Sequence, residues 1–162
     1  MVNRHEAPAA GAEQRLKDLG IALPPAPTPF GSYVEAARIG KLLFLSGMLP
    51  VVGHEPQFIG RVGEELSTED GRKAAEIAVL SALSAIRDHL GSLDKVTGVA
   101  KLGVYIATPG DFREHPKVAD GASDLLLKVF GPEMLSPRIV LGVASVPLGM
   151  PVEIELILEV AD

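Results

Sequence analysis

The C-terminal segment of the chain alternates between apolar and mostly acidic residues. Its apolar row is Val152, Ile154, Leu156, Leu158 and Val160, and the row between them is Glu153, Glu155, Ile157 and Glu159. Successive side chains of a strand point to opposite faces, so this period of two predicts a strand with one buried face and one acidic face. Such a strand requires a sheet whose two faces meet different surroundings.

The rest of the chain predicts further strands and helices around this segment. Apolar runs bounded by glycine or proline predict strands at 33–38, 41–46, 99–107 and 139–146. Apolar residues at spacings of three and four predict helices at 12–19, 68–90 and 117–130. The order ββαβαββ after the first short helix favours an α+β fold, in which one mixed sheet is covered on one face by two helices.

Four local predictions accompany this order. Ile39-Gly40 is expected to form the turn between the first two strands, and the run LLFL at 42–45 is expected to be covered on both faces. The segment 23–31, with four prolines, is expected to be extended, and 49–66 to be a long irregular loop. Oligomerisation would cover the helix-free face of the sheet.

Length and composition indicate one domain over 1–162. The formal net charge of −6 and the lack of a basic cluster argue against a nucleic-acid partner. The chain has no cysteine, which excludes disulfides and thiolate chemistry. With no secretory leader and no apolar run of membrane length, we expect a soluble, cytoplasmic protein without a membrane partner.

Common catalytic signatures for nucleotide, hydrolase or metalloprotease sites are absent from the sequence. The histidines are His5, His54, His89 and His115, and their spacing does not suggest a metal site, so we expect no metal and no cofactor. Arg138 precedes an apolar strand and can bind a carboxylate through its planar guanidinium. From the residues alone, a solvated edge strand with a paired arginine remains the favoured interpretation.

The motifs around Arg138 add a family resemblance. Arg138 is followed by VASVP at 143–147 and VEIE at 152–155, and upstream lie Gly31-Ser32-Tyr33 and SGMLP at 46–50. From about residue 25 to the end, this pattern resembles the YjgF-like or reactive intermediate deaminase (Rid) family, also labelled L-PSP endoribonuclease. Relative to this pattern, residues 1–24 form an N-terminal extension. This extension and the long loop resemble a longer and less characterised subgroup.

The resemblance implies a chorismate-mutase-like fold assembled as a homotrimer, with sites in clefts between subunits. It also implies hydrolytic deamination of small carboxylate-bearing imines or enamines of the 2-aminoacrylate type, releasing ammonia and a 2-keto acid. Carried over by position, Arg138 anchors the substrate carboxylate and Glu153 positions the hydrolytic water. Tyr33, Ser46 and Gly47 shape the substrate pocket.

Two departures from the family pattern keep other functions open. Val140 stands where the family often has cysteine and would form a more apolar pocket wall, and Met48 replaces the usual glutamine. Both favour the alternative of a non-catalytic trimer that binds a small carboxylate. A third option, endoribonuclease or translation inhibitor, follows only from the family's older label.

Overall fold

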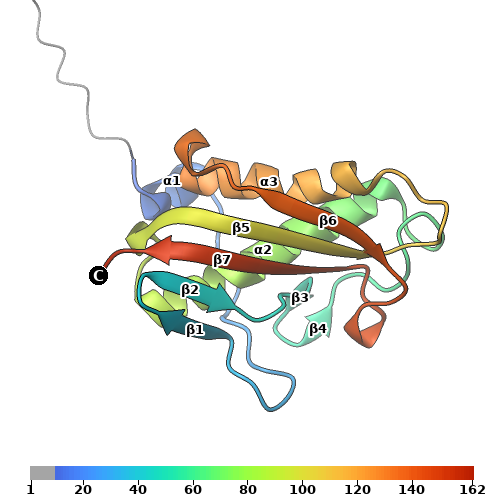
Figure 1. The fold of residues 1–162 in the computed structure, drawn as a ribbon, viewed down its shortest axis with the longest axis horizontal. Coiled ribbons are helices and arrows are strands. Elements are labelled where there is room, and N and C mark those ends of the chain that lie inside the picture. The colour runs from blue at the N-terminus through green and yellow to red at the C-terminus, as the bar shows by residue number, and fades with distance from the viewer. Residues whose placement is uncertain (1–9) are drawn as a thin grey trace, which may run out of the picture.

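The structure, a computed structural model, describes residues 10–162 and has a five-stranded mixed sheet with the order β1-β2-β7-β5-β6. Two long helices, α2 (Thr68–Leu90) and α3 (His115–Phe130), lie together on one face of this sheet (Figure 1). The predicted α+β class and the coverage of one sheet face by two helices are therefore confirmed.

The central strand of the sheet is β7 (Val152–Val160), which runs antiparallel to β2 (Leu42–Leu45) and to β5 (Val96–Ala107). One edge is β1 (Ala36–Ile39), antiparallel to β2. The other edge is β6 (Arg138–Val143), which is parallel to β5. Parallel neighbours require a crossover connection, and α3 supplies it.

The alternation in β7 divides the sheet into a covered and an open face. The entire apolar row of β7 is buried beneath the helices, together with Leu43, Leu102 and Val104 of the neighbouring strands. The acidic row lies on the open face. Burying this many aliphatic side chains supplies the main stabilisation of the fold, at about 25 cal/mol per Å² of apolar surface removed from water.

Large apolar side chains also lie on the open face of the single chain. Leu42, Ile139 and Leu141 belong to this face and are exposed, and Ile39 at the edge is 69% exposed. The expectation that 42–45 is covered on both faces is not met within one chain, because only Leu43 and Leu45 of this run are buried.

Several boundaries differ from those predicted. The first hairpin pairs Ile39 with Leu42, so its turn is Gly40-Lys41 rather than Ile39-Gly40, and Gly40 takes the positive φ of 61°. The first strand starts only at Ala36, and β6 ends at Val143.

The long loop at 49–66 contains two very short strands. These are β3 (Val51–Val52) and β4 (Glu55–Pro56), which form a small separate hairpin. The prediction of a wholly irregular loop was therefore wrong here.

Helix α2 begins and ends at the predicted residues, 68 and 90. The Ser67 side chain accepts a hydrogen bond from the Asp70 N–H, while the Asp70 carboxylate accepts from the Ser67 N–H, which makes a capping box. Gly91 ends the helix in the left-handed conformation, with φ of 81°.

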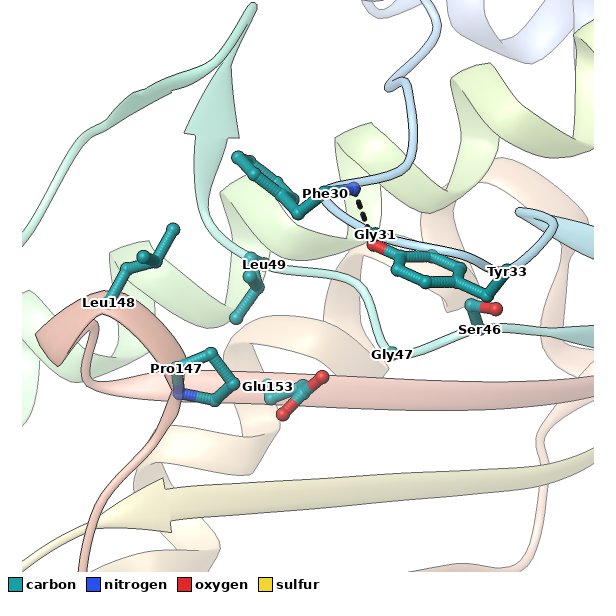
Figure 2. A pocket seen from close by; sticks show the side chains of 9 residues that line it. All are labelled: Phe30, Gly31, Tyr33, Ser46, Gly47, Leu49, Pro147, Leu148 and Glu153. Atoms are coloured by element: carbon teal, nitrogen blue, oxygen red, sulfur yellow. Dashed lines mark hydrogen bonds between the residues drawn. The ribbon is translucent and has the colours of Figure 1, made fainter.

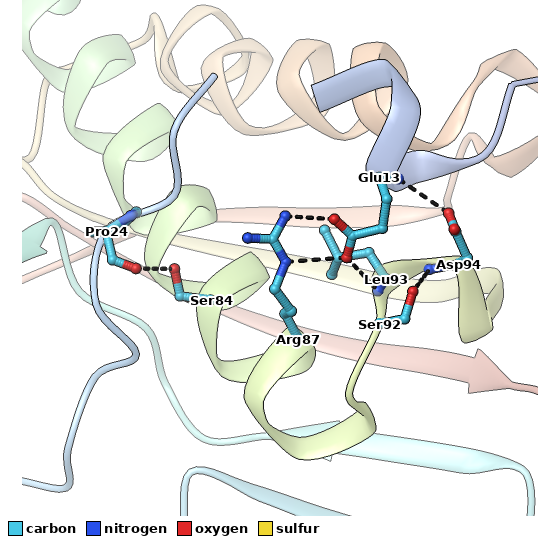
Figure 3. A network of polar contacts seen from close by, with 7 residues as sticks. All are labelled: Glu13, Pro24, Ser84, Arg87, Ser92, Leu93 and Asp94. Carbon is cyan, nitrogen blue, oxygen red and sulfur yellow. Dashed lines mark hydrogen bonds and ion pairs between the residues drawn. The ribbon is translucent and has the colours of Figure 1, made fainter. Parts of the chain in front are cut away.

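The short helix α1 (Ala12–Asp18) is fixed to the body of the protein by a polar network. Glu13 accepts two hydrogen bonds from Arg87 of α2 and one from the N–H of Leu93, while its own N–H donates to Asp94 (Figure 3). Leu93 and Asp94 belong to the short helix η1 (Leu93–Lys95). The network therefore joins α1 to the end of α2 and the start of β5.

Two further short 3₁₀ turns flank β6. They are η2 (Pro132–Met134) before the strand and η3 (Pro147–Gly149) between β6 and β7. Among residues 10–162, no helix is long and apolar enough to cross a membrane.

Candidate active site

A pocket of about 410 Å³ lies beside the start of β7. Its walls come from the proline-rich segment before β1, the residues just after β2, the turn η3 and one side chain of β7 (Figure 2). The lining residues are Phe30, Gly31, Tyr33, Ser46, Gly47, Leu49, Pro147, Leu148 and Glu153. Four of the residues assigned from the sequence, Tyr33, Ser46, Gly47 and Glu153, therefore come together.

A β-bulge places Gly47 against Glu153. Phe44 pairs with Ile157 and Met48 with Ile154, so the chain advances four residues after β2 while β7 advances three. The extra residue re-aims the backbone at this point. A Cβ atom on Gly47 would overlap the Glu153 carboxylate, so only glycine leaves this space to the acid.

The Glu153 carboxyl is the acidic group of this pocket. It lies on the open face of the sheet, in register with Tyr105 of β5. Burial raises the pKa of Glu153 above its ordinary value, because a carboxylate loses hydration among apolar walls. A carboxyl with a raised pKa accepts a proton from water more readily than an exposed one.

Two hydrogen bonds fix the Tyr33 side of the pocket. The Phe30 N–H donates to the Tyr33 hydroxyl oxygen at 2.9 Å, and the Ser46 hydroxyl donates to the Val34 carbonyl at 2.6 Å (Figure 2). Within residues 10–162 the Tyr33 hydroxyl donates to no group, so its proton is available to a ligand. The Ser46 proton is already used, and Ser46 therefore positions the Tyr33 segment.

The opposite wall is apolar and was not predicted. Phe30 follows the prolines, Leu49 follows the SGM segment, and Pro147 and Leu148 belong to η3. Leu49 and Pro147 belong to the motifs SGMLP and VASVP, so their position near the site could have been inferred. No sequence pattern indicates Phe30 or Leu148.

Arg138 does not line this pocket in the single chain. Its Nη1 donates to Asp120 at 2.9 Å and to Ser123 at 3.0 Å, both on α3. Arg138 is in register with Leu102, whereas Glu153 is in register with Tyr105, and the two side chains belong to opposite sheet faces. Strand spacings separate their Cα atoms by roughly 14 Å.

The guanidinium of Arg138 keeps one edge available. Both of its hydrogen bonds come from Nη1, and in the described part of the chain neither Nε nor Nη2 donates to a protein group. Its side chain is 28% exposed. The Nε–Nη2 edge has the geometry that binds a carboxylate through two parallel hydrogen bonds.

The two departures from the family pattern lie on the covered side of the sheet. Met48 is 2% exposed and belongs to the hydrophobic core. Val140 packs partly buried against the same core, in register with Val104. Neither side chain lines the pocket that contains Glu153.

The described residues hold no group of three or more histidine, cysteine or acidic side chains that could bind a metal. His5 lies outside the described residues. His54 contacts Phe30 and Thr28, and His115 lies beside Thr108 and Phe112.

Comparison with known proteins fits the fold and the motifs. A family model described as YjgF/chorismate mutase-like, putative endoribonuclease matches residues 13–160. The chain belongs to this family. The matched range includes nearly all of α1 and the whole sheet.

Individual relatives of this YjgF-like chain cover most of its length. Protein TCP17 of Trypanosoma cruzi is 39% identical over 89% of this chain and 91% of its own. A 2-iminobutanoate/2-iminopropanoate deaminase of Dermatophagoides farinae is 28% identical over 85% of this chain and 92% of its own. A solved structure of a protein of unknown function from Agrobacterium tumefaciens is 34% identical, covers 93% of this chain and 92% of its own, and has a TM-score of 0.85.

Proposed function

We propose that the protein hydrolyses small carboxylate-bearing imines, and the enamines in equilibrium with them, to 2-keto acids and ammonia. The observation that carries the proposal is the half-buried Glu153 carboxyl, which faces a pocket otherwise lined by apolar groups, Tyr33 and Ser46. The resemblance to a protein named as a 2-iminobutanoate/2-iminopropanoate deaminase supports it.

This hydrolysis needs few catalytic groups from the protein. An imine carbon is electrophilic, so water adds to it once it is oriented and relieved of a proton. In this mechanism Glu153 takes that proton as the water oxygen bonds to the carbon of the protonated imine, and the C=N electron pair moves to nitrogen to give a neutral carbinolamine. Glu153 then returns the proton to the amine nitrogen. The C–N bond breaks as ammonia leaves, and the hydroxyl of the carbinolamine gives its proton to the Glu153 carboxylate, which leaves the carbonyl of the 2-keto acid.

Tyr33 and Gly47 orient the substrate in this proposal. The Tyr33 hydroxyl is held by the Phe30 N–H and directs its own proton to the ligand. The N–H of Gly47, which donates to no protein group within residues 10–162, is a second donor. Together these two groups donate hydrogen bonds to the substrate, while Glu153 takes the proton from the water that attacks the imine carbon.

The carboxylate anchor in this proposal is Arg138 of a neighbouring copy of the chain. Arg138 belongs to the edge strand β6, where a second copy can approach, and its free guanidinium edge suits a carboxylate. Association of copies would remove the exposed apolar side chains of the open face from water, which favours an oligomer. The proposed assembly is a homotrimer with sites between subunits.

The alternative of a non-catalytic carboxylate-binding trimer has less support from the geometry. It was favoured by Met48 and Val140, and both side chains lie on the covered side of the sheet, away from Glu153. An ionised Glu153 repels a carboxylate ligand, so a site that only binds carboxylates gains nothing from this acid.

The test is the release of 2-keto acid from enamine that a serine or threonine dehydratase produces in the same cuvette. The wild-type protein should accelerate release beyond spontaneous hydrolysis, and Glu153→Gln should lose this acceleration. Glu55→Gln, at an exposed position of β4, is the matched control and should keep it. Full activity in Glu153→Gln, or no acceleration by the wild type, would overturn the proposal.

A further inference from the structure

Leu148 has an unusual backbone for its residue type. It is the one non-glycine residue between 10 and 162 with a positive φ, at 58°, and its side chain is 59% exposed at the rim of the pocket. A branched apolar side chain in the left-handed region is unfavourable, and strain of this kind concentrates at ligand sites. The positive φ of Leu148 therefore points to a function at the pocket.

The turn that holds Leu148 is supported by the long loop at 49–66. The Gly60 N–H donates to the Gly149 carbonyl at 2.9 Å, and the Gly149 N–H donates to Val146 at 3.2 Å. The side chain of Ile59 lies against Gly149. The loop thus fixes the left-handed turn, which sets the direction in which Leu148 projects.

Phe30, which belongs to the same apolar wall as Leu148, is also fixed by neighbouring residues. Its N–H bonds to Tyr33, and its ring lies 5.1 Å from the ring of His54, which in turn hydrogen-bonds Thr28. His54 is in the turn between β3 and β4. The proline-rich segment and the long loop therefore meet at Phe30, and Figure 2 shows Phe30, Leu49 and Leu148 along one side of the pocket.

The charges around this apolar wall determine which substrate side chains can bind there. Glu153 is the one ionisable carboxyl among the nine lining residues, and no lysine, arginine or histidine is among them. A second carboxylate on a ligand would lose hydration against the wall and be repelled by Glu153. A branched aliphatic or thioether side chain would replace water against Phe30 and Leu148.

We propose that Phe30 and Leu148 form a side-chain subsite that selects imino acids with bulky apolar side chains. This deepens the proposed function and rests on it. The proposal gives a function to the proline-rich segment and to the long loop, which the family motifs do not explain. The proline-rich segment contributes Phe30, and the long loop supports the turn of Leu148. Acidic imino acids, and those with only a methyl side chain, are the poorer substrates.

The first measurement compares turnover of imino acids that a broad-range amino-acid oxidase produces from leucine, methionine, alanine and glutamate. The wild type should prefer the leucine and methionine imines. One buried methylene discriminates by roughly 10-fold or more, so Leu148→Gly should lower the leucine-over-alanine ratio of kcat/KM by about tenfold. Leu148→Asn, which tolerates the same backbone, should lower it as well.

Controls separate the subsite from folding and assembly. Glycine is comfortable at positive φ, so Leu148→Gly should unfold at the same or a higher temperature than the wild type. Light scattering should give it the wild-type mass. Leu19→Ala, at an exposed leucine that ends α1, should leave the preference unchanged.

Binding distinguishes failure of the subsite from failure of the deaminase. Calorimetry with 4-methyl-2-oxopentanoate, pyruvate and 2-oxoglutarate should give the tightest binding for the first, with the gain lost in Leu148→Gly. That result without any imine turnover would refute the deaminase and keep the subsite. Turnover without preference, or a preference unchanged in Leu148→Gly and Leu148→Asn, would overturn the subsite.

Discussion

Gly47 and Glu153 compete for the same space. The bulge after β2 brings the Gly47 backbone so close to β7 that any Cβ there would overlap the Glu153 carboxylate. The acid is thereby held between the bulge and the apolar wall of the pocket, where burial raises its pKa. The glycine of the SGM segment is therefore a spatial requirement of the acid.

Gly47→Ala should remove most activity while leaving the protein folded. The Glu153 side chain can rotate away from the new methyl, but a displacement of about 1 Å can cost on the order of a hundredfold in rate. The measurement is kcat/KM with an imine substrate, alongside thermal unfolding. Gly110→Ala is the matched control, since nothing lies within 4 Å of its Cβ position and its φ is not positive. If Gly47→Ala and Gly110→Ala had equal activity, the overlap between a Cβ at position 47 and the Glu153 carboxylate would not matter for catalysis.

Glu153→Gln should stabilise the protein at neutral pH. Because the folded-state pKa of Glu153 lies above its ordinary value of 4.5, folding is favoured below that value and the advantage is lost as pH rises through the folded pKa. The neutral amide avoids this loss. Urea unfolding at pH 7 and pH 4 should show a gain for the variant at pH 7 that disappears at pH 4. A variant less stable than the wild type at pH 7 would contradict burial as the cause.

The contact between Glu13 and Arg87 predicts the opposite pH dependence. Burial alone would raise the pKa of Glu13, but the hydrogen bonds from Arg87 and from the Leu93 N–H outweigh it, and the pKa is lowered. The stability that this contact provides is present above the ordinary value of 4.5 and is lost as pH falls through the folded pKa.

Glu13→Gln should therefore lower the free energy of unfolding at pH 7, by about 1–2 kcal/mol for the lost charge-assisted bonds. The measurement is urea unfolding of wild type and variant from pH 3 to pH 7. The difference should shrink toward pH 3. Glu55→Gln serves again as the exposed control, and an equal loss in that variant would mean that the network around α1 does not stabilise the fold.

Much of the fold could be predicted because its signals are local. The period-two pattern of β7 and the caps of α2 fix strand and helix within their own segments. The turn at Gly40-Lys41 was placed one residue too early, because only pairing of Ile39 with Leu42 sets the register.

The site was predictable only where it coincides with motifs. Tyr33, Ser46, Gly47 and Glu153 come together as the resemblance implies. Leu148 could not be found, since its position at the pocket depends on a left-handed turn that a hydrogen bond from Gly60, far away in sequence, supports. Placing Arg138 relative to Glu153 required the strand order, which no local pattern contains.

The separation of Arg138 from Glu153 within one chain leads to a test of the shared site. If each site takes Arg138 from one copy and Glu153 from the next, Arg138→Ala and Glu153→Gln should each be inactive alone but complement each other when co-expressed. In a ring of three that contains both variants, one site of the three receives both native residues, so the mixed complexes should regain about a third of wild-type activity. The assay is imine turnover by complexes purified through different tags on the two variants. Arg72→Lys, at an arginine that also pairs with an aspartate of α3, should keep full activity on its own. If both single variants are inactive and their mixture stays inactive although mixed complexes form, Arg138 and Glu153 act from the same chain and the inter-subunit site is refuted.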